Sequence, residues 1–316
     1  MTTSVALLFP GQGAQVAGMG RDLAAVFPEA RHAFEEADEA LGFSLTRLCF
    51  EGSDSDIRPT EIAQPALLTC SIAALRCITE QNIHPTAAAG HSLGEYTALV
   101  AAGALSFADG VRLVRRRGQL MAEAGVASPG AMAAVLGLDG ATVTNVCELV
   151  LRETGEIVVP ANFNAPGQVV ISGTSEGVNA ASTRLKLAGA SRVIPLAVSG
   201  AFHSPLMTAA ARGMEAELVR TAFSPAEIPV IANTTAAPVV SPEEIRTALV
   251  CQMASGVRWD ESIRSLRDMG VTHYLELGSG KVLSGLARKI LPGASAYSIN
   301  DSVGVANLAA FLDTAS

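Results

Sequence analysis

A serine lies at the centre of the glycine-bounded pentapeptide GHSLG at residues 90–94. The pentapeptide follows a short apolar run at residues 86–89 and precedes a helical pattern over residues 95–102. Glycines two positions either side of Ser92 allow a sharp strand-to-helix turn, so the pattern predicts a nucleophile elbow that projects the serine hydroxyl. A glycine-rich turn that only starts a helix is the alternative.

Backbone amides near this serine are the expected donors to an oxyanion. The N–H of Leu93 directly follows the nucleophile and lies at a positive helix end. A loop with the sequence GQG follows the first predicted strand, residues 4–9, and is expected at the same sheet edge. Its Gln12 N–H is the expected second donor. A dinucleotide-binding loop is disfavoured because Val16 occupies the third glycine position, and a plain loop remains the other interpretation.

A serine nucleophile needs a base within hydrogen-bond reach. His203 directly follows a predicted strand and precedes a helix whose expected cap is Ser204, and α/β folds place active-site loops at such strand ends. His91 is adjacent to Ser92 but should point elsewhere on a sharp turn. A histidine of the capping region without chemistry is the alternative for His203. The histidines considered are His32, His84, His91, His203 and His273.

One arginine falls on the wrong face of a predicted helix over residues 107–124. Helical periodicity places Arg117 in the middle of the apolar half. A guanidinium directed into a core is costly unless it meets an anion, and its planar fork fits a carboxylate. A substrate carboxylate and an internal Asp or Glu satisfy this requirement equally well, so periodicity leaves both open.

Alternating strands and helices must position these residues. The pattern predicts an α/β fold with a largely parallel sheet covered on both faces, of the α/β-hydrolase-like kind. The last strand is expected at residues 274–277. Residues 128–199 instead show the order βαββαβ, which is ferredoxin-like. We therefore expect a large α/β domain over 1–127 and 200–316, with a small ferredoxin-like domain inserted at 128–199.

Bulk composition excludes several classes of function. The 316 residues carry a formal net charge of −8 and only 4% aromatics, which disfavours nucleic-acid binding. No apolar stretch of membrane-spanning length lacks glycine, proline or charge, and no basic segment precedes the N-terminal apolar run. The five cysteines show no metal-ligand spacing. We expect a cytoplasmic protein with no metal site and no membrane or nucleic-acid partner.

The ordered set of motifs resembles the malonyl-CoA:acyl carrier protein transacylases of fatty-acid synthesis. The resemblance covers nearly the whole chain and is far more specific than any single motif. One departure is Ser279, where the family often has proline. The motifs are FPGQG at 9–13, QPA at 64–66, GHSLGEY at 90–96, RG at 117–118, NFNAPGQ at 162–168, FHS at 202–204, Gln252 and GSGKVL at 278–283.

The resemblance implies a role for several residues. It makes Ser92 the nucleophile, His203 its base and Arg117 the residue that holds the malonyl carboxylate. It also implies that Gln252 orients His203 through a carbonyl, which accounts for the lack of an obvious triad aspartate. The backbone donors implied are those of Gln12 and Leu93, and the further substrate-binding residues are Asn162 and Phe202, the latter resembling the malonyl-selecting version of its loop.

The activity implied is a ping-pong transfer of malonyl from malonyl-CoA to the phosphopantetheine thiol of acyl carrier protein. A malonyl-serine would be the intermediate, and no metal or redox cofactor is needed. A stand-alone acyltransferase that loads a polyketide synthase carrier is one alternative. A serine thioesterase or esterase is another, although simple acyl chains need no buried cation.

Overall fold

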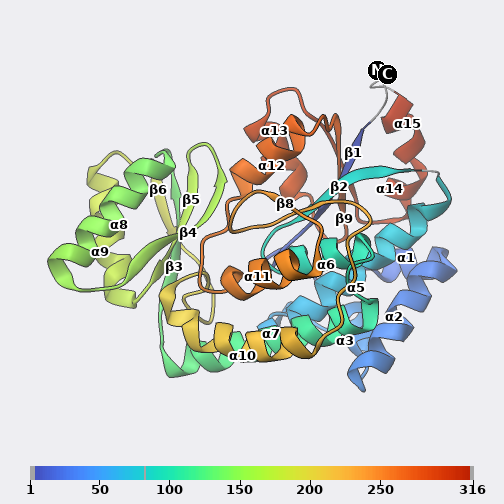
Figure 1. Ribbon diagram of the computed structural model, residues 1–316, viewed down its shortest axis with the longest axis horizontal. Coiled ribbons are helices and arrows are strands. Elements are labelled where there is room, and N and C mark those ends of the chain that lie inside the picture. Colours follow the sequence, from blue (N-terminus) through green and yellow to red (C-terminus); the bar gives the residue numbers. More distant parts are fainter. Residues whose placement is uncertain (1–3, 82, 314–316) are drawn as a thin grey trace.

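Two β-sheets organise the chain, which is described over residues 4–81 and 83–313 by a computed structural model (Figure 1). The larger sheet has six strands in the order β10-β9-β1-β2-β7-β8, and all neighbours pair in parallel except β7 with β8. The predicted α/β class with a parallel sheet is therefore confirmed. Its strands are β1 (Val5–Phe9), β2 (Pro85–Gly90), β7 (Val230–Ile231), β8 (Pro238–Val239), β9 (His273–Leu277) and β10 (Ser295–Ile299).

The central strand β1 is buried on both faces. Leu7 and Phe9 enter one apolar core, while Ala6 and Leu8 enter a separate core on the opposite face. Since side chains alternate along a strand, a continuous apolar run is what a doubly covered parallel strand requires. Phe9 pairs with Gly90 in the parallel register. The loops that follow β1 and β2 therefore leave the sheet side by side.

Helices cover both faces of this sheet (Figure 1). On one face lie α1 (Arg21–Val26), α2 (Pro28–Leu41), α3 (Leu45–Glu51), α4 (Asp54–Ile57), α5 (Thr60–Ile78), α6 (Gly94–Ala101), α7 (Phe107–Ala127), α10 (Thr208–Arg220) and α11 (Pro242–Gln252). On the other lie α12 (Trp259–Asp268) and α13 (Val282–Ile290). The short 3₁₀ segments Thr79–Gln81 and Pro205–Met207 and the helices α14 (Ser302–Ala306) and α15 (Leu308–Asp313) complete the larger lobe.

Helix α5 forms the centre of the helical layer. It is the one helix within residues 4–81 and 83–313 that is long and apolar enough to cross a membrane by length and composition, and most of it is buried in the protein. Gly118 on α7 lets the two helices approach closely, because a Cβ there would lie 2.6 Å from the Cα of Glu61 on α5. This close packing brings the neighbouring Arg117 against α5.

A second lobe projects from the larger one (Figure 1). Its four strands are antiparallel in the order β4-β5-β3-β6, and two helices pack on one face of the sheet through a separate apolar core. These elements are β3 (Ala131–Leu136), α8 (Gly140–Thr154), β4 (Val158–Ala165), β5 (Gln168–Gly173), α9 (Ser175–Leu187) and β6 (Arg192–Pro195).

The expectation that residues 274–277 form the last strand is wrong. Strand β10 follows α13 and pairs in parallel with β9 at the sheet edge. Its sequence SAYSI mixes small polar and apolar residues, and only Ala296 and Ile299 are buried. An edge strand of this kind lacks the continuous apolar run that marks a central parallel strand.

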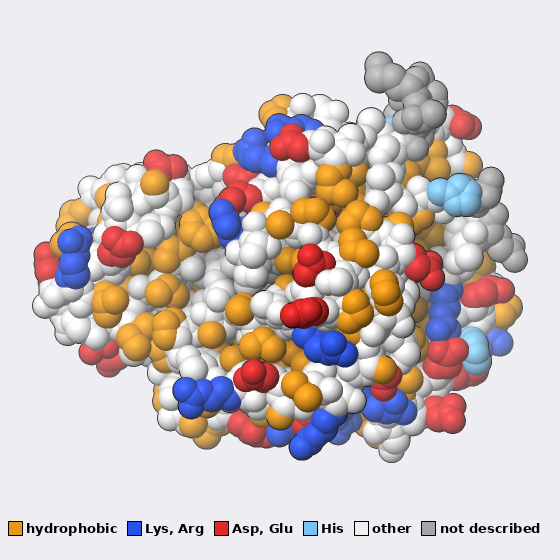
Figure 2. Space-filling model, viewed as in Figure 1, with side chains coloured by type: hydrophobic (Ala, Val, Ile, Leu, Met, Phe, Trp, Pro, Cys, Tyr) orange, Lys and Arg blue, Asp and Glu red, His pale blue; other side chains and the backbone are white. Residues whose placement is uncertain are grey.

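Acidic and basic side chains are interspersed over the face shown in Figure 2. No broad basic stripe crosses that face, in keeping with the net charge of −8. That face does not present the positive track that a nucleic-acid backbone requires.

Candidate active site

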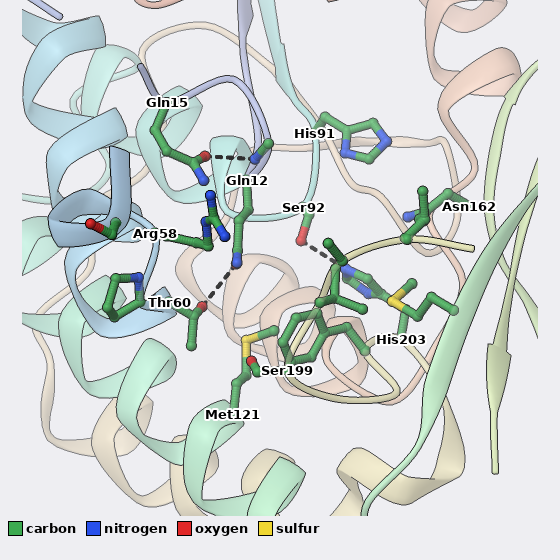
Figure 3. Close-up of a pocket in the computed structure, with 18 residues that line it drawn as sticks. Gln12, Gln15, Arg58, Thr60, His91, Ser92, Met121, Asn162, Ser199 and His203 are labelled. Atoms are coloured by element: carbon green, nitrogen blue, oxygen red, sulfur yellow. Dashed lines mark hydrogen bonds between the residues drawn. The ribbon is translucent and has the colours of Figure 1, made fainter. Parts of the chain in front are cut away.

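Ser92 lies at a strained turn between β2 and α6. Its φ is 54°, in the left-handed region that residues with a Cβ rarely adopt. A Cβ at Gly90 would overlap the carbonyl of Gly94, and one at Gly94 would overlap the carbonyl of Phe9. Both glycines are therefore dictated by the close approach of strand, turn and helix. The turn directs the serine hydroxyl into a cavity (Figure 3).

His203 meets Ser92 across the cavity floor. Its Nε2 lies 2.7 Å from the serine Oγ (Figure 3), and its Nδ1 lies 3.0 Å from the carbonyl oxygen of Gln252 and 3.1 Å from that of Ser255. Carbonyl oxygens only accept hydrogen bonds, so Nδ1 carries the ring proton. Nε2 is then free to accept the proton of the serine hydroxyl.

The environment of His203 favours this neutral form. Burial lowers the pKa of His203 to about 3, and the nearby positive charge of Arg117 acts in the same direction. The imidazole is therefore unprotonated at neutral pH. The residue also has a φ of 57°, so both halves of the Ser92–His203 pair stand on left-handed backbone.

Arg117 is buried, with 1% of its surface exposed, and its guanidinium is directed at the Ser92 hydroxyl. Nη2 donates to the Oγ of Ser92 at 3.1 Å and to Oε1 of Gln252 at 2.8 Å, while Nη1 donates to Oε1 of Gln64 at 2.8 Å. Its Nε has no hydrogen-bond partner within the described residues. None of the salt bridges of the described chain includes Arg117. Within the described chain, the Arg117 guanidinium is therefore hydrogen-bonded only to neutral oxygens, and its Nε–H is still free to donate.

The loop after β1 approaches the same cavity. The hydroxyl of Thr60 donates to Oε1 of Gln12 at 2.8 Å (Figure 3) and accepts from Nε2 of Gln64 at 2.9 Å. The N–H groups of Gln12 and Leu93 donate no hydrogen bond within residues 4–81 and 83–313. Gln12 lines the same cavity as Ser92, and Leu93 directly follows Ser92, so these unpaired amides are candidates for stabilising negative charge on a carbonyl oxygen.

The cavity has a volume of about 730 Å³ and opens between the two lobes. Asn162 of β4 is 7% exposed, and Phe202 is 6% exposed beside His203. The walls are mostly apolar, as in most small-molecule sites. The lining residues are Gln12, Gly13, Gln15, Ser55, Arg58, Pro59, Thr60, His91, Ser92, Met121, Met132, Asn162, Leu196, Ala197, Val198, Ser199, Phe202 and His203.

Two buried residues that sequence reasoning missed support the turn from below. The side chain of Asn233 accepts from the N–H of Ser92 at 2.7 Å and donates to the carbonyl of Gly90 at 2.7 Å. The carboxylate of Glu95 accepts from Nε2 of Gln252 at 2.7 Å and from the N–H of Asn233 at 3.2 Å. Asn233 belongs to none of the motifs quoted above, whereas Glu95 stood within GHSLGEY without an assigned role.

His91 and His32 bond to other groups than the Ser92 hydroxyl. His91 lines the cavity, but its Nε2 pairs with Oδ1 of Asn164 at 2.9 Å and its ring packs on Trp259. Exposed His32 lies beside two glutamates of its own helix. Across residues 4–81 and 83–313, no group of three or more His, Cys, Asp or Glu side chains is placed to hold a metal ion.

Comparisons with known proteins match this geometry over the full chain. The acyl transferase domain family matches residues 6–297. The chain is 48% identical to a malonyl CoA-acyl carrier protein transacylase of Bacillus subtilis, over 95% of this chain and 94% of that one. It is 43% identical to the Escherichia coli K12 protein of the same name, over 96% and 98% of the two chains.

Solved structures give the same result. A malonyl-transacylase in complex with a type II PKS acyl-carrier protein has a TM-score of 0.93 and 41% identity, covering 99% of this chain and 100% of that one. An acyl carrier protein S-malonyltransferase of Vibrio cholerae has a TM-score of 0.93 and 40% identity, covering 97% and 100%. With this likeness over its whole length, the chain belongs to the acyl transferase family and, within it, to the malonyl CoA-acyl carrier protein transacylases.

Proposed function

We propose that this protein transfers a malonyl group from malonyl-CoA to the phosphopantetheine thiol of acyl carrier protein. The observation that carries the proposal is the shared position of Ser92, whose hydroxyl touches both the base His203 and the cation Arg117. The proposed nucleophile and base line the cavity, and the buried cation contacts the same serine hydroxyl from behind the cavity lining. Transfer follows a ping-pong cycle through a malonyl-serine.

In the first half-reaction, Nε2 of His203 removes the hydroxyl proton while the Oγ of Ser92 attacks the thioester carbonyl. The carbonyl oxygen becomes an oxyanion, which the N–H groups of Gln12 and Leu93 stabilise. The C–S bond then breaks, and the proton held by His203 passes to the departing thiolate. Coenzyme A leaves as a thiol and the malonyl group remains as an ester of Ser92.

In the second half-reaction, the carrier's thiol gives its proton to His203 and attacks the malonyl-serine carbonyl. The same two amides stabilise the oxyanion. The ester bond breaks, the proton returns to the Oγ of Ser92, and malonyl leaves as a thioester of the carrier. The carbonyls of Gln252 and Ser255 hold the His203 ring in the required tautomer throughout.

Selection of a malonyl group rests on Arg117. A buried guanidinium without a carboxylate in a salt bridge has a strong preference for an anionic partner. The free carboxylate of malonyl supplies one, which acetyl lacks. Phe202 and Asn162 line the path and shape the space around the acyl group. A hydrolase of simple acyl esters would gain nothing from this cation, which argues against the thioesterase and esterase alternatives.

The identity of the carrier is a separate question, because one of the similar structures contains a type II PKS acyl-carrier protein. The chemistry at Ser92 is the same for a fatty-acid and a polyketide carrier. We favour the fatty-acid carrier, because the ordered set of motifs resembles the transacylases of fatty-acid synthesis. The cycle takes place on side chains, amides and thiol substrates, so it calls for no metal or redox cofactor, and it suits a cytoplasmic enzyme.

The same proposal covers the domain organisation. The order β4-β5-β3-β6, with α8 and α9 on one face, supports a ferredoxin-like domain over 128–199 inserted into an α/β-hydrolase-like domain over 1–127 and 200–316. The helix–strand order βαββαβ and the separate apolar core of this lobe agree with that division.

Intact-mass measurement tests the proposed activity. Mixed with malonyl-CoA, the protein should gain one malonyl group, and addition of a holo acyl carrier protein should move that group to the carrier. The Ser92→Ala variant should show no adduct. A hydrolase would release free malonate and accumulate no loaded carrier, and that outcome would refute transfer.

A further inference from the structure

Glu95 is a buried carboxyl group that the proposed mechanism does not use. It lies on α6, one turn after the nucleophile, and is 1% exposed. Its Oε2 accepts hydrogen bonds from Nε2 of Gln252 at 2.7 Å and from the N–H of Asn233 at 3.2 Å. Burying a carboxyl group costs free energy, and the hydrogen bonds that Glu95 makes must offset this cost. These hydrogen bonds therefore indicate its role.

The side-chain amide of Gln252 has two ends that must be told apart. Nε2 donates to Glu95 and to the carbonyl of Ser92, while Oε1 accepts from Nη2 of Arg117 at 2.8 Å. If the amide were turned over, Oε1 would face the two acceptors and Nε2 would face the donor Arg117. The acceptors on Glu95 and on the Ser92 carbonyl therefore favour the orientation in which Oε1 of Gln252 faces the guanidinium, and Glu95 is the one of the two that a substitution can remove.

Residue 252 also reaches the base. Its main-chain carbonyl accepts from Nδ1 of His203 at 3.0 Å. Gln252 thus contacts the arginine with its side chain, the histidine with its carbonyl and the nucleophile's own carbonyl with its amide. Glu95 holds Gln252 and touches none of the reacting atoms itself.

We propose that Glu95 is a positioning residue, which fixes the amide of Gln252 and, through it, the orientation of Arg117 toward a substrate carboxylate. The inference rests on the proposed function, because it assigns to Glu95 a part in malonyl selection. A positioning role for Glu95 requires an acceptor oxygen within hydrogen-bond distance of Gln252. A purely electrostatic role would instead require the negative charge of the carboxylate.

Two conservative substitutions separate these properties. Glu95→Gln keeps the length and an acceptor oxygen but removes the charge. Glu95→Asp keeps the charge but withdraws the carboxylate by one methylene, out of reach of Gln252. The matched control is Glu276→Gln, since Glu276 is an equally buried carboxylate that accepts from the N–H groups of Leu283 and Ser284 at the start of α13.

The measurement is kcat/KM for acyl-enzyme formation from malonyl-CoA and from acetyl-CoA, per folded protein. Glu95→Asp should lower the malonyl-over-acetyl preference by about tenfold, the value of one lost charge-assisted hydrogen bond. Glu95→Gln should keep the preference within about threefold, as should the control. If Glu95→Gln lost the malonyl-over-acetyl preference and Glu95→Asp kept it, the inference would be overturned, because the charge of Glu95 would then be what matters.

Equal loss of both activities with an unchanged preference would also overturn the inference, since it would leave only a structural role. If the aspartate variant fails to fold, the glutamine variant still decides, because loss of its preference contradicts positioning by reach. Absence of malonyl transfer by the unsubstituted protein would instead refute the proposed function. The two failures are therefore distinguishable.

Discussion

Arg117 donates a hydrogen bond from Nη2 to the hydroxyl oxygen of Ser92, so the proposed carboxylate receptor and the proposed nucleophile are in contact at 3.1 Å. The guanidinium keeps further donors, because among the described residues its Nε–H has no acceptor and Nη1 donates only to Gln64. We therefore expect a substrate carboxylate to bind Arg117 next to the Ser92 hydroxyl, and an acyl group without a carboxylate to leave these donors unpaired.

Replacing Arg117 with alanine should remove that discrimination. We expect kcat/KM for malonyl-CoA to fall by about 100-fold or more, as for loss of one partner of a buried charge pair. Acetyl-CoA should be affected less, so relative preference should shift toward acetyl. Acyl-enzyme mass spectra with both donors measure the ratio. Arg112→Ala, at an exposed arginine of the same helix, is the control, and an unchanged ratio at 117 would remove the carboxylate role.

The close backbone packing at the nucleophile can be tested with glycine substitutions. Gly90→Ala should destabilise the fold by about 3 kcal/mol, because the new methyl group would overlap the carbonyl of Gly94. Gly285→Ala is the control, since nothing lies within 4 Å of its Cβ position on α13. The control should gain about 0.5–1 kcal/mol from its helical position. Urea unfolding measures both, and equal stabilities would contradict this description of the turn.

Asn233 should be needed for both stability and rate. Asn233→Ala leaves the N–H of Ser92 and the carbonyl of Gly90 without their partners in a site where Asn233 is 0% exposed. The expected loss is about 3 kcal/mol of unfolding free energy. The acylation rate should fall as well, because the strained turn loses its support.

Thermal denaturation and single-turnover acylation provide these two readouts. Asn300→Ala is the comparison, because Asn300 also donates to a glycine carbonyl but is exposed. Wild-type rates in the Asn233 variant would show that the turn needs no such support.

The depressed pKa of His203 sets a distinctive pH dependence. The folded-state pKa of about 3 lies below the ordinary value of 6.5, so the neutral base persists as pH falls below 6.5. Acylation measured at about pH 5 should remain within about twofold of its value at neutral pH. Below pH 6.5 the unfolded chain binds the proton more readily, so the stability contributed by His203 is present above 6.5 and is lost progressively toward pH 3. An acylation midpoint near 6.5 would contradict this environment.

Ser92 and Arg117 could be proposed as site residues from the sequence because each stands out in a short local pattern. The elbow at Ser92 is a pentapeptide, and the misplaced cation at Arg117 is visible from the period of a single helix. The roles of Asn233 and Glu95 depend instead on contacts across 138 positions of sequence, for which no local pattern exists. Strand β7 has only two residues, too short a run to be recognised from periodicity.

The choice left open at Arg117 shows the same limit. Helix periodicity predicted that the Arg117 guanidinium is buried but could not identify its neighbours. These are oxygens from α5, the elbow and α11. Three segments distant in sequence meet there, through the packing of α7 against α5 and α6 and of α11 against α10.

The cavity wall supplied by the smaller lobe has a consequence for divergence within the family. Met132, Asn162 and Leu196 come from that lobe or its margin and line the cavity, yet the proposed reacting groups stand on the larger lobe. Substitutions in the smaller lobe can therefore change the shape of the cavity wall while the Ser92–His203 contact is retained. We expect differences in acyl preference between relatives to arise in this wall without loss of the reacting pair.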